Sequence, residues 1–156
     1  MKAYSILLIL MLTGSSVVAH AQQKASVTID GHAIALAYSA PATKTCAAAS
    51  FHTESDVAFK GISVPKGDYT LYVLAVGAQW QLAVNKATGP KAATYDPKLD
   101  LGKVAMTMAK APAPAATCNI TLTKSAAMAA RVEVTWNDSV ASAAFHLDRA
   151  SADSEW

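Results

Sequence analysis

Large apolar and polar side chains alternate along most of this chain with the period of two residues that is typical of β-strands. The pattern is clearest at residues 67–86, GDYTLYVLAVGAQWQLAVNK, which predict two strands joined by a turn at Gly77-Ala78. The positions expected to face the core are Tyr69, Leu71, Val73, Ala75, Trp80, Leu82 and Val84, and those expected on the opposite face are Tyr72, Leu74, Val76, Gln79, Gln81 and Asn85. Because the first strand is apolar on both faces, we expect it to be central and covered twice, with Tyr72 as a candidate surface platform.

A second predicted hairpin lies at residues 26–38, where Asp30-Gly31 separates two alternating runs. Asp-Gly is a strong signal for a two-residue hairpin turn. On the strand after the turn, one face carries Ile34, Leu36 and Tyr38. The other face carries only alanines, at positions 33, 35 and 37, which keep it thin and permit another layer to approach closely.

Shorter apolar runs predict the remaining strands, near residues 57–59, 62–64, 104–108, 119–123, 132–136 and 140–147. The connections are expected to be a loop at 41–55, a stiff extended linker at 111–116 (APAPAA), a helical turn or wide loop at 125–131, and a turn at Asn137-Asp138. Alanine favours helices, but the period of two dominates. We therefore predict an all-β fold, an antiparallel β-sandwich that is jelly-roll-like, with eight to ten short strands.

The first 21 residues have the three parts of a secretory signal peptide. Lys2 supplies the positive start, residues 6–12 form an apolar run, and Ala19-His20-Ala21 matches an A-x-A cleavage site. The alternative is a membrane anchor, which needs about 20 apolar residues. We expect cleavage near Ala21 and no stable membrane span. The chain then consists of a signal peptide at 1–21, a single domain at 22–150 and a frayed tail at 151–156, and the cleaved protein is expected to be secreted, in the periplasm.

The charge balance argues against two classes of partner. The chain has 13 Lys and Arg against 11 Asp and Glu, a net charge of +2. A near-neutral chain with scattered charges lacks the basic patch that nucleic-acid binding needs. Because opposite charges alternate, attraction to a membrane surface is expected to be weak as well.

Two cysteines are present, Cys46 and Cys118. In an exported chain an even number of cysteines predicts pairing, so we expect one disulfide bond. It would close a loop that the chain-entropy model values at roughly 4 kcal/mol, and usually less in practice. The alternatives are two buried thiols or a reactive cysteine, although neither residue lies in a recognisable reactive setting.

The segment from Pro65 through the 95–104 region resembles a bacterial secreted family catalogued as domain of unknown function 2911. The matching residues are Gly67, Tyr69, Leu71, Trp80, Asn85, Lys86, Tyr95, Asp96, Asp100, Leu101, Gly102 and Val104, followed by Val134 and Trp136. The resemblance covers roughly residues 25–147. It implies an exported β-sandwich and no particular activity.

One segment departs from the family pattern. Relatives carry a stretch similar to G…PYGxVWRTGANEAT, whereas this chain has TKTCAAASFHTESDVAF at residues 43–59. If relatives use that stretch as a site, this chain has lost or replaced it. The cysteine in its place suggests replacement by a crosslink to Cys118.

No catalytic or metal-binding motif stands out. The HxH, HExxH and G-x-S-x-G patterns are absent, so no cofactor or metal is expected. His52 with Glu54 and Asp56 is the best candidate for a site that binds a metal or moves a proton, and a solvated loop is the alternative. Asp96 and Asp100 are a carboxylate pair of the kind used in glycoside cleavage, and turn formation with loop capping is the alternative.

A small polar cluster of Asn85, Lys86, Tyr95 and Asp96 is expected where the second strand of the 67–86 hairpin ends. It either fixes the loop or contacts a ligand. We predict a non-enzymatic module that binds a small ligand or an envelope protein. The alternative is a hydrolase-type enzyme that uses loop residues 52–56 or 95–100.

Overall fold

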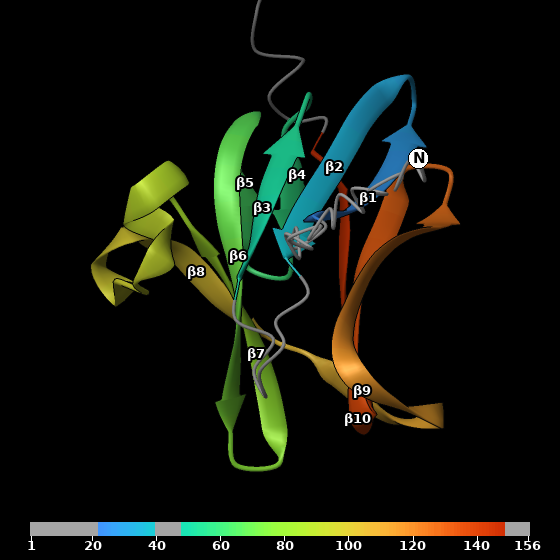
Figure 1. Ribbon diagram of the computed structural model, residues 1–156. Coiled ribbons are helices and arrows are strands. Elements are labelled where there is room, and N and C mark those ends of the chain that lie inside the picture. The colour runs from blue at the N-terminus through green and yellow to red at the C-terminus, as the bar shows by residue number, and fades with distance from the viewer. Residues whose placement is uncertain (1–21, 40–47, 149–156) are drawn as a thin grey trace, which may run out of the picture.

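Two antiparallel β-sheets pack face to face in the computed structural model, which describes residues 22–39 and 48–148 (Figure 1). The six-stranded sheet has the order β1 (Gln22–Ile29), β2 (His32–Ser39), β3 (Ala48–Thr53), β6 (Gly67–Val76), β7 (Gln79–Asn85), β8 (Asp100–Ala105). The four-stranded sheet has the order β5 (Ile62–Val64), β4 (Val57–Phe59), β10 (Ala129–Leu147), β9 (Thr107–Ala126). Two short 3-10 helices, η1 (Gly89–Ala93) and η2 (Pro97–Leu99), lie between β7 and β8. The predicted all-β antiparallel sandwich is confirmed.

The predicted hairpin at Asp30-Gly31 is confirmed and joins β1 to β2. Both turn residues have positive φ, 49° and 78°, as a type I′ turn requires. Beyond the turn, Ile34, Leu36 and Tyr38 are buried between the sheets, at 0%, 2% and 6% exposure. The period of two then places the intervening alanines of β2 on the outer face of the six-stranded sheet.

Aromatic contacts join the two sheets at two places in the core. Phe51 of β3 lies with its ring centroid 6.1 Å from that of Phe145 of β10, which in turn lies 5.1 Å from Phe59 of β4. The Trp80 and Trp136 rings, from β7 and β10, lie 6.1 Å apart. The largest fully buried side chains are Phe51, Phe59, Phe145, Ile29, Ile34, Leu36, Leu82, Val57, Val64, Val84, Val132 and Val134.

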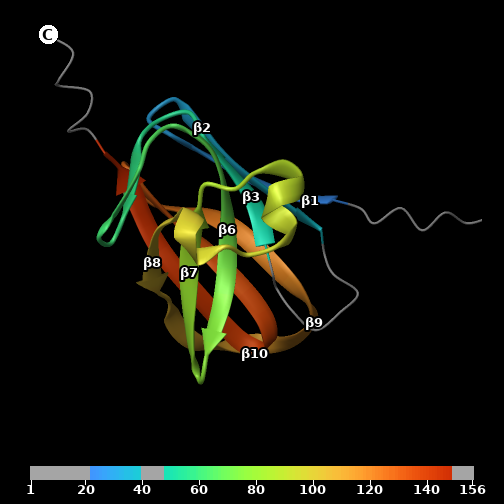
Figure 2. The ribbon, with the colours of Figure 1, turned by 90° about the vertical axis from the view of Figure 1, so that its left-hand side faces the viewer.

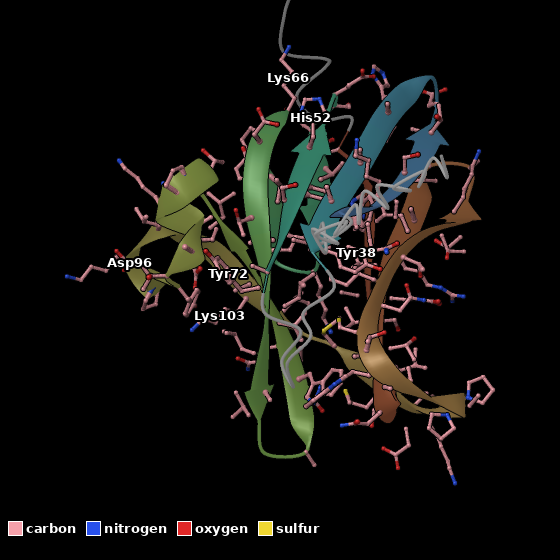
Figure 3. The ribbon with its side chains drawn as sticks, in the orientation of Figure 1. Tyr38, His52, Lys66, Tyr72, Asp96 and Lys103 are labelled. Carbon is pink, nitrogen blue, oxygen red and sulfur yellow. The ribbon has the colours of Figure 1, made fainter. Side chains whose placement is uncertain are left out.

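A tyrosine hydroxyl connects the sheets where β2 approaches β9. Tyr38 donates to Asn119 Oδ1 at 2.9 Å and accepts from the Ile120 backbone N–H at 3.0 Å. Because β9 is the last strand of its sheet, this N–H has no neighbouring strand to bond with. The side chain of Tyr38 thus satisfies part of an exposed strand edge and holds the two layers together (Figure 3).

The predicted loop at 41–55 is wrong for its second half, because residues 48–53 form β3, between β2 and β6 in the sheet. Alternate residues of this strand are buried, with Ala49 at 2%, Phe51 at 1% and Thr53 at 1% exposure. Only Phe51 is large and apolar. The alternation is therefore weak in the sequence, and burial against the second sheet reveals it.

The predicted linker at 111–116 and the predicted turn at Asn137-Asp138 are also wrong as separate connections. Both segments lie inside the long strands β9 and β10, opposite one another at an irregular bulge. Four residues of β9, 111–114, face one residue of β10 there, and Asn137 has a φ of 53°. Prolines are tolerated at this place because β9 is an edge strand and its ladder is interrupted. The segment predicted as a helical turn or wide loop holds a tight turn at residues 127–128.

The predicted hairpin at 67–86 is confirmed as β6 and β7, with exceptions to its predicted faces. Ala75 is exposed, and so is Val76 at 58%, because the tip of the hairpin extends beyond the opposite sheet (Figure 1). Tyr69 is only partly buried, and its hydroxyl donates to the Pro65 carbonyl at 2.8 Å. The predicted strand at 104–108 is divided at Met106, where β8 ends and β9 begins.

Residues 1–21, 40–47 and 149–156 lie outside the described part of the chain. The signal peptide, Cys46 and the frayed tail therefore stay predictions. Among the described residues no helix is long and apolar enough to cross a membrane.

Gly102 of β8 provides a test of how closely the edges of the two sheets approach. A Cβ at this position would lie 2.8 Å from Ile62 Cγ1 of β5, which is closer than two carbons pack. We expect Gly102→Ala to lower the free energy of unfolding by about 1–3 kcal/mol, measured by urea denaturation.

The matched control places the same substitution in an Ile62→Ala background, where the clashing atoms are gone. There the additional cost of Gly102→Ala should fall below about 1 kcal/mol. Equal costs in the two backgrounds would show that the contact between β8 and β5 is not the cause.

Candidate functional site

The outer face of the six-stranded sheet, away from the second sheet, carries an ordered set of small and polar side chains. The strand register arranges them in two adjacent rows across β1, β2, β3 and β6. One row is Ser26, Ala35, His52 and Asp68, and the other is Lys24, Ala37, Ser50 and Thr70. Figure 2 looks toward this face, with the connection that contains η1 and η2 in front of it.

A hollow of about 750 Å³ opens over these rows, and we call it the outer-face trough. Its lining includes Lys24, Ser26, Ala35, Ala37, Ala48, Ser50, His52, Asp68, Thr70, Thr88, Gly89 and Ala92. The floor is low because three of its positions carry only a methyl group. On the side next to β6, Thr88 and the η1 residues Gly89 and Ala92 border the trough, and we call this segment the wall.

Hydrogen bonds from the sheet fix this wall in place. Thr70 Oγ1 donates to the Ala87 carbonyl at 2.6 Å, and Tyr72 OH donates to the Ala92 carbonyl at 2.6 Å. Both tyrosine and threonine are buried, at 4% and 3% exposure. Tyr72 does lie on the face opposite the core, as expected, but it supports the wall and is no open platform (Figure 3).

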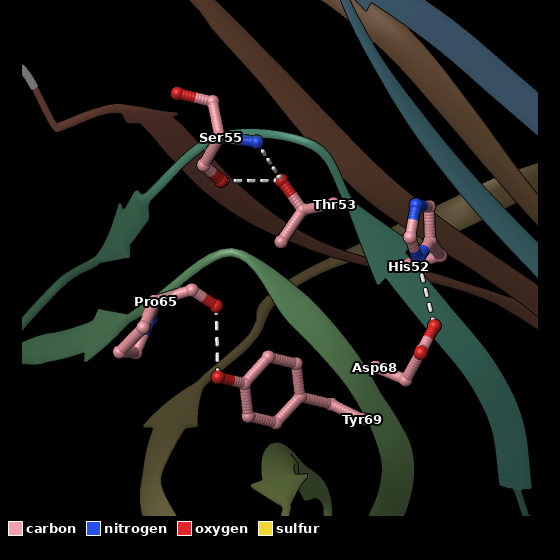
Figure 4. Close-up of polar contacts among 6 residues, drawn as sticks. All are labelled: His52, Thr53, Ser55, Pro65, Asp68 and Tyr69. Atoms are coloured by element: carbon pink, nitrogen blue, oxygen red, sulfur yellow. Dashed lines mark hydrogen bonds and ion pairs between the residues drawn. The ribbon is translucent and has the colours of Figure 1, made fainter.

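His52 and Asp68 form an ion pair within the lining, with 2.7 Å between Nδ1 and Oδ1 (Figure 4). They are directly opposite one another on β3 and β6. Their side chains are 52% and 73% exposed, so water screens the pair and it adds at most about 1 kcal/mol to stability. The pair therefore presents polar groups to the trough more than it holds the sheet together.

The two acidic residues of the FHTESD segment bond to backbone N–H groups of other strands and turns. Glu54 Oε2 accepts from the Ala33 backbone N–H at 2.8 Å, and Asp56 Oδ1 accepts from the Lys66 backbone N–H at 2.7 Å. Over residues 22–39 and 48–148, no three His, Cys, Asp or Glu side chains are grouped so as to hold a metal ion.

Asn85, expected to face outward toward solvent, is fully buried at 0% exposure. The unbroken register of β6 and β7 places Asn85 opposite Thr70 on the outer face of the sheet, and the connection that follows β7 covers it there. Its Nδ2 donates to the Asp96 carbonyl and to Asp100 Oδ1, both at 2.8 Å, and its Oδ1 accepts from the Ala87 N–H at 2.9 Å. The amide thus ties both ends of the connection to the sheet.

Asp100 is the partner that connects Asn85 to Tyr95. The Tyr95 hydroxyl donates to Asp100 Oδ2, and its ring lies 4.9 Å from the Tyr72 ring. Lys103 Nζ lies 3.9 Å from Asp100 Oδ2. Burial raises the pKa of the Tyr95 phenol well above 10.0, and the hydrogen bond to Asp100 raises this pKa further.

The remaining residues of the predicted cluster act at the loop surface. Asp96 Oδ1 accepts from the Lys98 N–H at 3.0 Å and so caps η2. The backbone N–H of Lys86 donates to the Leu99 carbonyl at 2.9 Å, and the residue is exposed. The carboxylates of Asp96 and Asp100 thus serve the loop in different ways.

The predicted site residues therefore fall in two places. Asn85, Tyr95 and Asp96 meet around Asp100, and His52 lies in the trough. Sequence reasoning did not identify the trough as a site. The sequence signal for the trough is the run of alanines at 33, 35 and 37, which leaves the outer face of β2 without large side chains. The floor also needs β3 beside β2, and this pairing was not predicted.

The phenol of Tyr95 gives a pH test of this loop. The unfolded chain releases this proton near pH 10.0 and the folded chain only at higher pH. The contribution of Tyr95 to stability is therefore complete below pH 10.0 and is lost as the pH rises toward the raised folded pKa.

We expect Tyr95→Phe to reduce the loss of unfolding free energy above pH 10.0, measured by urea denaturation at a series of pH values. Ultraviolet absorbance titration of the folded proteins should show that the variant has one fewer tyrosine with a pKa above 10.0 than the parent. Identical pH profiles for the parent and the variant would contradict the assigned hydrogen bond to Asp100.

Comparison with known proteins gives a family but no activity. Residues 43–145 match the model of a family described as protein of unknown function (DUF2911). No curated protein and no solved structure matches the chain at a significant level. The matched residues make up most of the sandwich, from the 43–59 segment to β10, and the chain belongs to the DUF2911 family.

Proposed function

We propose that this protein is an exported β-sandwich that binds a small ligand in the outer-face trough. The observation that carries the proposal is the hollow itself. Its volume of about 750 Å³ falls within the roughly 300–1,000 Å³ of small-molecule sites. It also combines apolar and polar groups, since alanine methyls form the floor and hydroxyl, His52 and Lys24 groups stand around it.

The rigidity of the surroundings supports a binding role. The floor lies on β2, β3 and β6, which have hydrogen-bonded strands on both sides. The wall is held by the Thr70 and Tyr72 hydroxyls and by the buried amide of Asn85. A site that is already formed loses little conformational entropy when a ligand binds.

Export and a disulfide bond are part of the same proposal. The first 21 residues have the order of charge, apolar run and A-x-A site that a signal peptidase recognises. Cys118, on β9, is buried in the core at 5% exposure, where a bridge to Cys46 would join the edge of the four-stranded sheet to the segment before β3. An oxidising compartment would form this bond.

To test export, the full chain is expressed in a bacterium and the periplasmic fraction is analysed by mass spectrometry. We expect a protein that begins at Gln22 and lacks titratable thiols when denatured. Reduction should lower its free energy of unfolding by up to about 4 kcal/mol. An uncleaved chain in the cytoplasm contradicts the leader, and two titratable thiols in the periplasmic protein contradict the bond.

To test the trough, we use phenylnaphthylamine, a neutral apolar molecule whose fluorescence rises when it leaves water. We expect it to bind the mature protein, and Ala37→Phe, which fills the floor, to weaken binding at least about tenfold. The matched control is Ala144→Phe, on the outer face of the other sheet, where Ala144 is exposed.

Both variants are checked by urea denaturation, because each substitution lies at a position outside the core. The proposal fails if the probe does not bind. It also fails if the two phenylalanine variants bind the probe as well as the parent does.

A further inference from the structure

We infer that the ligand of the outer-face trough is an organic anion with a flat apolar body, whose acidic group is held by Lys24. This inference rests on the proposed function and specifies its ligand. It follows from the charges around the trough and from the shape of its floor.

The charged groups of the lining differ in whether they have a partner. Its basic side chains are Lys24 on β1 and His52 on β3, and its acidic side chain is Asp68 on β6. Asp68 lies 2.7 Å from His52. No carboxylate of the described residues forms an ion pair with Lys24. The lysine is therefore the charge that an anionic ligand can neutralise, and a cationic ligand would meet it as a like charge.

The floor favours a flat apolar body. Ala35 and Ala37 are neighbours on the same face of β2, and Ala48 lies on the same face of β3, next to Ser50. Methyl groups at these positions leave a level surface. Because strands lie about 4.8 Å apart, the four strands from β1 to β6 span about 14 Å, which is wide enough for two fused aromatic rings.

The register places the basic group at one side of this floor. Lys24 lies directly opposite Ala37, in the row that continues to Ser50 and Thr70. A ring that rests on Ala37 therefore has its edge toward Lys24 and its opposite edge toward the wall above Thr70. An acidic group on the edge toward β1 would reach the lysine without leaving the floor.

A carbohydrate is the less favoured ligand. Sugars are commonly bound against an exposed aromatic ring, because the apolar face of the sugar packs on it. On this face Tyr72 is only 4% exposed and its ring lies 4.9 Å from that of Tyr95, below the wall. Phe51 and Tyr69 also border the trough. Phe51 is only 1% exposed in the core and Tyr69 packs against that core, so neither ring lies open on the outer face.

The test compares two probes that share one skeleton. Anilinonaphthalenesulfonate is phenylnaphthylamine with a sulfonate group, so the pair differs by the negative charge. On the mature protein we expect the anion to bind more tightly than the neutral probe. Lys24→Gln should weaken the anion about fivefold and leave the neutral probe unchanged.

Two controls make the comparison specific. Lys124→Gln removes an exposed lysine from β9, on the other sheet, and should change neither affinity. Naphthoate should displace the anionic probe while acetate at the same concentration should not, since acetate lacks the flat body. Added salt should weaken the anion more than the neutral probe.

The outcomes separate the two proposals. If Ala37→Phe blocks the neutral probe but Lys24→Gln leaves the anion unaffected, the trough binds ligands and the anion inference is wrong. The same conclusion follows if Lys24→Gln weakens both probes equally. If the neutral probe does not bind, or if Ala37→Phe does not weaken its binding, the proposed function itself fails.

Discussion

The buried amide of Asn85 determines how the chain leaves the six-stranded sheet and returns to it. Its oxygen accepts from Ala87 and its nitrogen donates to the Asp96 carbonyl, both in the connection between β7 and β8, and the nitrogen also donates to Asp100 at the start of β8. A buried polar group without partners costs about 1–3 kcal/mol, so the connection is held where it satisfies this amide. The wall of the trough is part of that connection, and Thr70 and Tyr72 add hydrogen bonds to its Ala87 and Ala92 carbonyls.

The two faces of the six-stranded sheet carry different side chains and have different roles. Its inner face supplies Phe51, Leu36 and Leu82 to a core shared with the second sheet. Its outer face has methyl and hydroxyl groups over β2 and β3, which leave room for a ligand, and large side chains over β6, which support the wall. Because successive strand residues point to opposite faces, one strand supplies apolar side chains to the core and other side chains to the trough.

Most residues of the family motif that the sequence analysis identified lie outside the lining of the trough, with Tyr69 as an exception. Asn85, Tyr95 and Asp100 bond to one another, and Gly102 permits β8 to pack against Ile62 of β5. These motif residues build the frame. Strand β3, which lies within the family match at 43–145, contributes Ala48, Ser50 and His52 to the trough. The lining residues of β1 and β2 come before the match.

The sequence by itself determined the all-β class, the hairpins at Asp30-Gly31 and Gly77-Ala78, and most core positions, because these depend on alternation and turn chemistry between neighbours in the chain. It also brought Asn85, Tyr95 and Asp96 together as a group. Tertiary structure decided that Asn85 is buried, that Asp100 is its central partner, and that residues 48–53 are an inner strand. It also created the trough, because the volume above Ala37 exists only where four strands and a distant wall meet, and such an arrangement has no signal within a short stretch of sequence.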